Sequence, residues 1–128
     1  LRAGTFRHLV IGNPVVAPYG VAAQQVLEKL GLWSSVRDRI VRGEDVGQFY
    51  AMVASGAAGA GFVALSQTLG AASPGSHWAV PQELYPPLKQ DAILVTRARA
   101  NPAAQVFLDY LKSPPARAVI AELGYGVP

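Results

Sequence analysis

The sequence predicts an α/β fold built around a mainly parallel sheet. Short apolar segments alternate with amphipathic ones along the 128 residues, as they do in strand–helix–strand units. The run Gly61–Leu65 is apolar throughout, a pattern typical of a strand that is covered on both faces. Helix-start signals follow the apolar segments, and a hydrophobic content of 51% is enough for a packed core.

The first predicted strand is Leu9–Ile11, and a proline-rich elbow turns it into a helix. Pro18 suits the first turn of that helix, because the N–H that proline lacks has no helical acceptor there. The helix is expected from Tyr19 to Leu30, and Gly31 is expected to end it. Its predicted apolar face comprises Ala22, Ala23, Val26, Leu27 and Leu30.

A second strand and helix are predicted further along the chain. The strand is the short apolar segment Ile40–Val41. Asp45 is followed three residues later by Gln48, which is the spacing of a capping box. The second helix is therefore expected to begin at Val46 and to end near Gly56.

The remaining part of the sequence alternates between extended and helical signals. Strands are expected at Trp78–Val80 and Asp91–Val95, and the prolines between them mark an irregular connector over 81–87. Two helices are expected at the end, over 102–111 and 114–123, because each opens with a proline that follows an Asn or a Ser.

Composition excludes several classes of function. The 11 Lys and Arg residues exceed the 8 Asp and Glu residues and give a net charge of +3, but they are scattered, so no nucleic-acid partner is expected. Apolar runs fall short of the roughly 20 residues of a membrane helix, so no membrane insertion is expected. The chain has no cysteine and begins at Leu1 without a signal-like segment, which suggests a processed or incomplete product.

Neither an enzyme nor a metal centre is predicted. His8 and His77 have no recognisable catalytic partners, and Ser66 lacks the flanking glycines of a nucleophile elbow. Glu44 and Asp45 are adjacent carboxylates, but no His or third carboxylate lies near them in the sequence. We therefore expect no catalytic residues, no cofactor and no direct cation ligands.

Two predicted helix starts are candidate anion-binding elements. The N–H groups at a helix N-terminus and the positive end of the helix dipole favour a bound oxyanion. The candidate donors are the backbone N–H groups of Tyr19 and Val46, with those of Gly20 and Gly47 as secondary candidates. The alternative, that both helix starts are merely self-capped and lie near each other through topology, stays open on these residues alone.

Specific strings of residues add a family resemblance. They are Asn13-Pro14, Ala17–Gly20 with Ala22-Ala23, Leu30–Trp33, Gly43–Val46, Gly61–Gln67, Val80-Pro81 with Leu84-Tyr85, Gln90–Ala92 and Gly124-Tyr125. With these strings the chain resembles the C-terminal half of the periplasmic molybdate-binding proteins of molybdate ABC transporters, the ModA family. The resemblance covers almost the whole sequence.

The resemblance implies a two-lobed fold of the type II periplasmic binding-protein class and a ligand, molybdate or tungstate, held between the lobes. It assigns the contacts in this half to the N–H groups of Tyr19 and Val46. Some members also carry a tyrosine after the third strand whose hydroxyl reaches the anion, and Ala64 occupies that position here. Residues 1–86 would be the second lobe, incomplete at its start. Residues 87–128 would be a return strand and helices that pack on the first lobe.

The implied function is that of the solute-binding component of an ABC importer. Such a protein is exported to the periplasm of a Gram-negative cell with its signal peptide removed, and it delivers the oxyanion to a membrane permease. Alone, these 128 residues are expected either to self-associate through the surface meant for the first lobe or to adjust their packing. The alternatives are a lobe that binds sulfate-like or organic anions, and the effector lobe of a regulator with the same fold.

Overall fold

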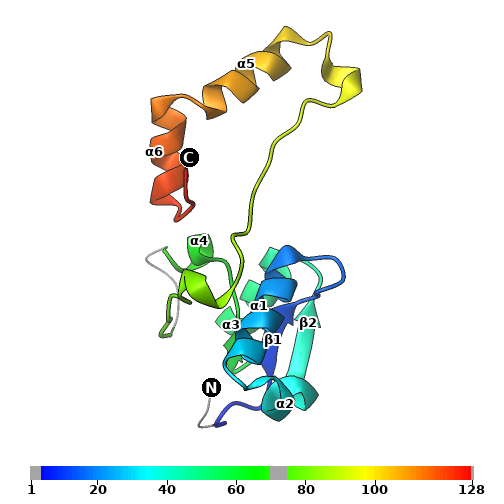
Figure 1. The fold of residues 1–128 in the computed structure, drawn as a ribbon, viewed down its shortest axis with the longest axis vertical. Helices are drawn as coiled ribbons and strands as arrows, with labels where there is room; N and C mark the ends of the chain where they lie inside the picture. Colours follow the sequence, from blue (N-terminus) through cyan, green and yellow to red (C-terminus); the bar gives the residue numbers. More distant parts are fainter. Residues whose placement is uncertain (1–3, 70–74, 128) are drawn as a thin grey trace. The chain divides into compact units, whose positions relative to one another are not determined.

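The computed structural model describes residues 4–69 and 75–127 (Figure 1). It divides into two compact units, Leu1–Leu88 and Lys89–Pro128. This boundary lies two residues beyond the one expected from the sequence, and the assignment of the units to two lobes stays a prediction. The first unit contains the sheet, and the second is helical.

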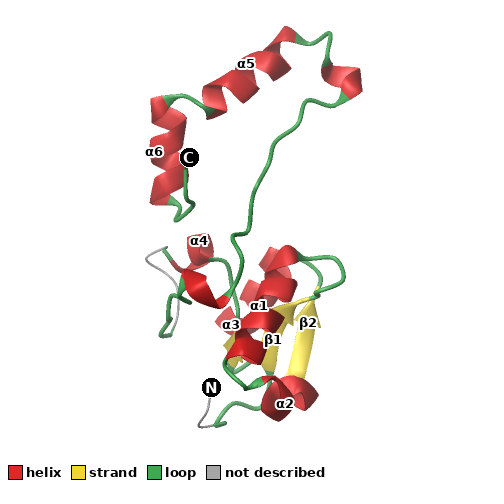
Figure 2. Ribbon diagram, in the orientation of Figure 1, coloured by secondary structure: helices red, strands yellow, loops and turns green. Residues whose placement is uncertain are grey.

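The sheet of the first unit has three parallel strands. They are β1 (Leu9–Gly12), β2 (Ile40–Gly43) and β3 (Ala60–Gly61), in the order β2-β1-β3. Leu9 pairs with Ile40 on one side and with Ala60 on the other. The predicted α/β fold with a parallel sheet is therefore confirmed, and Figure 2 shows the strands beside the helices that follow them.

Both faces of the sheet are covered by helices of this unit. They are α1 (Pro18–Lys29), α2 (Trp33–Val36) with a 3-10 turn at Arg37–Arg39, and α3 (Val46–Ala54). Because side chains alternate along a strand, β1 contributes to two hydrophobic clusters. One cluster contains Leu9, Ile11, Ala23, Leu27 and Val36; the other contains Val10, Phe49 and Ala58.

The predicted helix boundaries in this unit are confirmed within two residues. Helix α1 ends at Lys29, and Gly31 has the positive φ of 66° that suits a glycine after a helix. Helix α3 begins at Val46, with Asp45 as its N-cap. These boundaries depend on local capping contacts, which the sequence shows directly.

Three predicted strands are wrong in whole or in part. The first is the strand expected over Gly61–Leu65. The observed strand β3 consists of Ala60–Gly61 alone, although Phe62 still donates its N–H to the Val10 carbonyl at 2.9 Å. The chain then turns into the short helix α4 (Leu65–Thr68), because the Gln67 side chain accepts the N–H of Ala64 at 3.2 Å and closes a turn there.

The predicted strands at 78–80 and 91–95 are not strands in the described structure. A strand is stabilised by its neighbour, and no described strand pairs with either segment. Most of their large apolar side chains lie exposed instead, with Trp78 61% and Ile93 81% accessible. A 3-10 turn at Gln82–Leu84 lies between the two segments.

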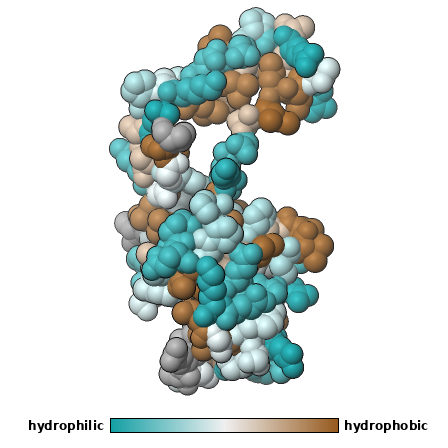
Figure 3. Space-filling model, viewed as in Figure 1, coloured by the Kyte–Doolittle hydropathy of each residue, from teal (hydrophilic) through white to brown (hydrophobic). Residues whose placement is uncertain are grey.

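The second unit consists of α5 (Pro102–Leu111) and α6 (Pro114–Glu122), preceded by a 3-10 turn at Thr96–Ala98. Both helices match the prediction, with side-chain caps from Asn101 and Ser113. Much of their apolar surface is uncovered, and Figure 3 shows hydrophobic residues gathered on this unit. The exposed large apolar residues of the two helices are Val106, Phe107, Tyr110 and Val119.

Candidate functional site

Three strand-to-helix connections meet at one edge of the sheet. They span residues 13–17 between β1 and α1, 44–45 between β2 and α3, and 62–64 between β3 and α4. Because the strands are parallel, their carboxyl ends lie at the same edge, which is where open α/β sheets bind ligands. This edge contains both helix starts that the sequence singles out.

The connection at 13–17 is a tight elbow organised by Asn13. Its carbonyl oxygen accepts the N–H groups of Val16 at 3.1 Å and Ala17 at 2.8 Å, and its side-chain oxygen accepts the N–H of Val15 at 3.1 Å. Ala17 is extended, and Pro18 is the first helical residue. The backbone N–H of Tyr19 therefore belongs to the first turn of α1, at the N-terminal end of the helix dipole.

Gly20 allows this elbow to sit directly against the end of β1. It is buried, and a side chain there would overlap the carbonyl oxygen of Gly12 and lie 2.7 Å from the Pro14 nitrogen. The N–H of Gly20 donates to the Ala17 carbonyl at 2.9 Å. This engagement makes Gly20 a weaker anion donor than its position in the sequence suggests.

At the start of α3, Asp45 caps the helix as the sequence predicts, but the return contact of the predicted capping box goes to Glu44 instead of Asp45. The Asp45 carboxylate accepts the N–H of Gln48 at 2.8 Å, and the Gln48 side chain accepts the N–H of Glu44 at 2.6 Å. No acceptor within residues 4–69 and 75–127 takes the N–H of Val46 or Gly47. Two adjacent amides at this helix start therefore remain available to a ligand.

The two helix starts are joined to each other. The Asn13 N–H donates to the Gly43 carbonyl at 2.8 Å, and the Asn13 side chain donates to both carboxylate oxygens of Glu44, at 3.0 and 3.2 Å. Below them, the rings of Tyr19 and Phe49 pack with centroids 6.4 Å apart. The ring of Tyr19 thus contributes to the core contact between α1 and α3.

The connections that form this edge carry no cationic side chain. The connections and first helical turns, at 13–20, 44–48 and 62–67, contain no Lys, Arg or His. Their two carboxylates, on Glu44 and Asp45, are hydrogen-bonded to Asn13 and to the α3 backbone. An anion at this edge would be held by backbone N–H groups and helix dipoles, without a cationic side chain.

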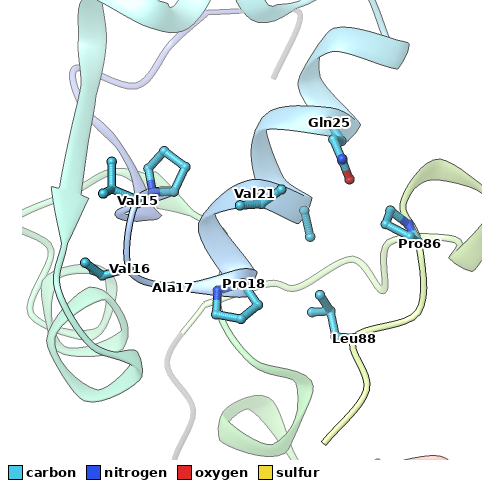
Figure 4. A pocket seen from close by; sticks show the side chains of 10 residues that line it. Val15, Val16, Ala17, Pro18, Val21, Gln25, Pro86 and Leu88 are labelled. Carbon is cyan, nitrogen blue, oxygen red and sulfur yellow. The ribbon is translucent and has the colours of Figure 1, made fainter.

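An apolar groove runs beside the start of α1 (Figure 4). Figure 4 shows Pro86 and Leu88 across from Val21 and Gln25. The remaining lining comes from the elbow and from Pro18 and Ala22 of α1. The Gln25 side-chain oxygen is buried here with no hydrogen-bond partner among the described residues. A groove with this lining offers a dianion no donors comparable to the helix starts, so we place the candidate site at the sheet edge.

Cationic side chains lie in a different groove, lined by Trp33, Arg37, Asp38, Ile40 and Arg42. Arg37 contacts the exposed Asp38 carboxylate at 3.6 Å. This groove is absent from the sequence-based candidates. Anions bind non-specifically to cationic surfaces of this kind. The two arginines of the groove therefore provide control positions for binding experiments.

The other residues weighed from the sequence form no site in the described structure. His77 is exposed and His8 half-buried, and no group of three potential metal ligands occurs within residues 4–69 and 75–127. None of the helices in those ranges combines the length and the apolar character needed to cross a membrane.

The sequence does not reveal two hydrogen-bonded links at the edge. One is the bridge from Asn13 to Glu44, and the other is the bond from the Gln67 side chain to the Val46 carbonyl at 2.9 Å. Their partners are 31 and 21 residues apart. The one available signal is that each residue lies in a string that the family resemblance singles out.

The fold and this edge define a ligand-binding α/β protein in which helix starts converge beyond the strand ends. The chain belongs to the family of bacterial extracellular solute-binding proteins, whose sequence profile matches residues 1–126. It is 49% identical to the molybdate-binding protein ModA of Azotobacter vinelandii over 129 aligned residues, which span 99% of this chain and 51% of that protein.

A second sequence relative and two solved structures support the same family and fold. Identity to ModA of Rhodobacter capsulatus is 44%, over 92% of this chain and 46% of the relative. The solved structure of the Azotobacter vinelandii periplasmic molybdate-binding protein superposes with a TM-score of 0.88 at 42% identity, covering 98% of this chain and 56% of that one. A Clostridium difficile substrate-binding domain, at 24% identity and a TM-score of 0.68, supports the fold alone.

The predicted resemblance to the C-terminal half of the ModA family is therefore confirmed, as is the periplasmic binding-protein fold. The chain spans about half the length of the curated relatives that it matches. These relatives are named as binding proteins, in agreement with the expectation of a non-enzyme.

Proposed function

We propose that this chain forms part of the solute-binding component of an ABC importer and binds molybdate or tungstate at the sheet edge. The donors are the backbone N–H groups of Tyr19 and Val46, with Gly47 as a secondary donor. The observation that carries the proposal is the pair of helix starts joined through Asn13 beyond the ends of β1 and β2. The names of the relatives supply the identity of the anion.

Neutral N–H donors suit a receptor that must bind a dianion and later release it. A charged side chain in a closed site would attract many anions, whereas oriented amides act only at hydrogen-bond distance. Molybdate and tungstate are similar in size and larger than sulfate. A cavity with fixed helix ends would therefore discriminate against sulfate through over-long hydrogen bonds, and it would not discriminate against tungstate.

The remaining donors would come from a first lobe. The relatives are about twice as long as this chain, and a lobe opposite the sheet edge would complete the shell around the anion. In that arrangement the protein works in the periplasm and delivers its ligand to a permease. The present chain alone should bind molybdate more weakly than a full-length receptor, because it provides part of the shell.

Isothermal titration calorimetry of this chain with molybdate, tungstate, sulfate and phosphate tests the proposal. We expect heats of binding for molybdate and tungstate and weaker or absent heats for the two smaller anions. The control is the Arg37→Gln, Arg42→Gln variant, which removes the cationic groove and should leave molybdate binding unchanged. Preference for sulfate or an organic anion, or loss of binding in the control, would overturn the proposal.

We also propose that residues 89–127 pack on the first lobe in a full-length receptor. Phe107, Tyr110 and Val119 expose 59%, 52% and 53% of their surface, and neighbouring apolar surface of this kind marks an interaction site. Without the first lobe the chain should self-associate through these helices. Sedimentation velocity should show a weight-average mass that rises with concentration and falls in a Phe107→Glu, Tyr110→Glu variant; a strictly monomeric native chain would contradict this.

A further inference from the structure

We propose that Asn13 and Glu44 are positioning residues that fix the two anion-binding helix starts relative to each other and so set the size of anion that fits. The inference rests on the proposed function, since it concerns the same sheet edge. It assigns a role to the Asn13-Pro14 string and to Glu44, neither of which touches the anion in the proposed binding mode.

Asn13 uses all of its polar groups at this edge. Its N–H binds the carbonyl of Gly43, its carbonyl oxygen holds the N–H groups of Val16 and Ala17, and its side-chain oxygen holds the N–H of Val15. The side-chain amide is then the one remaining donor, and it reaches the Glu44 carboxylate. The elbow that leads into α1 is thus fixed to the end of β2 through a single residue.

Glu44 is fixed to the second helix in a comparable way. Its N–H donates to the Gln48 side chain at 2.6 Å, and Gln48 belongs to the first turn of α3. Its carboxylate receives the Asn13 amide through both oxygens, at 3.0 and 3.2 Å. A chain of hydrogen bonds therefore runs from the α1 elbow through Asn13 and Glu44 to the first turn of α3.

This chain of bonds has a consequence for selectivity. The α1 start is held by Asn13, and the α3 start is held by the cap that includes Glu44, so the bridge limits how far the two sets of N–H groups can separate. A fixed separation favours one anion size, because hydrogen bonds weaken as the donor–acceptor distance grows. Loosening the bridge should therefore change the ratio of affinities for two anions, beyond a uniform loss of binding.

The test reverses the direction of the bridge. Asn13→Asp keeps the oxygen that accepts the Val15 N–H but places a second carboxylate against Glu44. Glu44→Gln retains an oxygen that can still accept the Asn13 amide. The double variant restores the bridge, with the new side-chain amide at position 44 as donor and the new carboxylate at position 13 as acceptor. It has the same net charge and nearly the same shape as the native pair.

Two quantities are measured in this chain. The first is the affinity for molybdate and for sulfate, by calorimetry. The second is the amide hydrogen exchange, by NMR without anion, of the hydrogen-bonded N–H groups in the two segments, those of Val15–Ala17 and of Glu44 and Gln48. We expect Asn13→Asp to weaken molybdate binding about tenfold, because a charge-assisted hydrogen bond becomes a repulsion between two carboxylates. It should also reduce the ratio of the affinity for molybdate to the affinity for sulfate. Exchange should accelerate in both segments. Glu44→Gln should change both quantities less, and the double variant should return both to within about twofold of native.

The proposal is overturned if Asn13→Asp leaves the affinity ratio and the exchange rates unchanged, or if the double variant is as impaired as Asn13→Asp. Should Asn13→Asp fail to fold, Glu44→Ala removes the bridge without adding a charge and is judged by the same two measurements. If the native chain binds no molybdate, the proposed function fails, and the exchange rates alone decide whether the bridge positions the two segments.

Discussion

Replacing Gly20 by alanine should separate the steric demand of the elbow from ordinary helix propensity. Within α1, alanine would normally be favoured over glycine by about 1 kcal/mol. At this position a Cβ would overlap the Gly12 carbonyl oxygen and lie 2.7 Å from the Pro14 nitrogen. Unstrained contacts lie near 3.5 Å, so the start of α1 must move by about 1 Å away from β1.

Displacement of this kind in a packed region costs about 1–3 kcal/mol. After the propensity gain is subtracted, we expect Gly20→Ala to lower the free energy of unfolding by up to about 2 kcal/mol in urea denaturation monitored by circular dichroism. It should also weaken molybdate binding about tenfold or more, because the amide of Tyr19 moves with the helix start.

The matched control is Gly47→Ala, the other helical glycine of this edge. There the closest atom to a new Cβ is Oδ1 of Asp45 at 3.2 Å, and a displacement of a few tenths of an ångström relieves this contact. The same oxygen accepts the Gln48 N–H at 2.8 Å, and so small a displacement keeps that bond within hydrogen-bond distance. Gly47→Ala should therefore leave the free energy of unfolding within about 0.5 kcal/mol of native or raise it slightly. A Gly20→Ala chain that is as stable as native and binds molybdate equally would refute the steric reasoning.

Three further substitutions test neighbouring contacts. Asp45→Ala removes the cap on the Gln48 N–H and should lower the free energy of unfolding, measured by urea denaturation, by about 1 kcal/mol. Asp45→Asn should keep most of the capping energy. An equal loss of stability in both variants would argue against a capping role. Phe49→Ala empties a fully buried position and should cost about 3–5 kcal/mol, with a loss below about 1 kcal/mol contradicting its place in the core. Lys29→Met removes the bond to the Glu83 carbonyl at 2.9 Å and should accelerate amide exchange at 82–88, whereas unchanged exchange would show that the bond does not hold this segment.

Local contacts explain which parts of the fold the sequence predicts well. The starts of α1, α3, α5 and α6 are set by prolines and by caps whose partners lie two or three residues away. Such contacts require no knowledge of the rest of the chain. The parallel sheet was also predictable, because alternating segments of strand and helix type allow few other arrangements.

Two of the errors in predicted strands have different causes. Hydrophobicity alone cannot distinguish a buried strand from a buried loop, so the run 61–65 was predicted as a strand although Gln67 folds its end into α4. The segment 91–95 has strand-like residues but pairs with no described strand. The first error comes from a local contact, between residues three apart, that the apolar pattern hides. The second concerns a segment for which the described residues contain no pairing strand.

The sequence also predicts the local parts of the candidate site and misses the contact between them. Both helix starts follow from capping signals, but the link between them joins residues 31 positions apart and leaves no periodic trace. Charge would even have argued against an anion here, since the edge contains Glu44 and Asp45 and no cation.

Each carboxylate at the edge is engaged by donors of the protein itself. Asn13 covers both oxygens of Glu44, and the α3 backbone covers Asp45. Hydrogen bonds to a carboxylate stabilise its charge locally and fix its direction, so the amides of Val46 and Gly47 can face a ligand although two negative charges lie beside them. Affinity at such an edge depends on the alignment of dipoles rather than on net charge. Changes of geometry at Gly20 or at the Asn13–Glu44 bridge should therefore affect binding more than the addition or removal of distant surface charges.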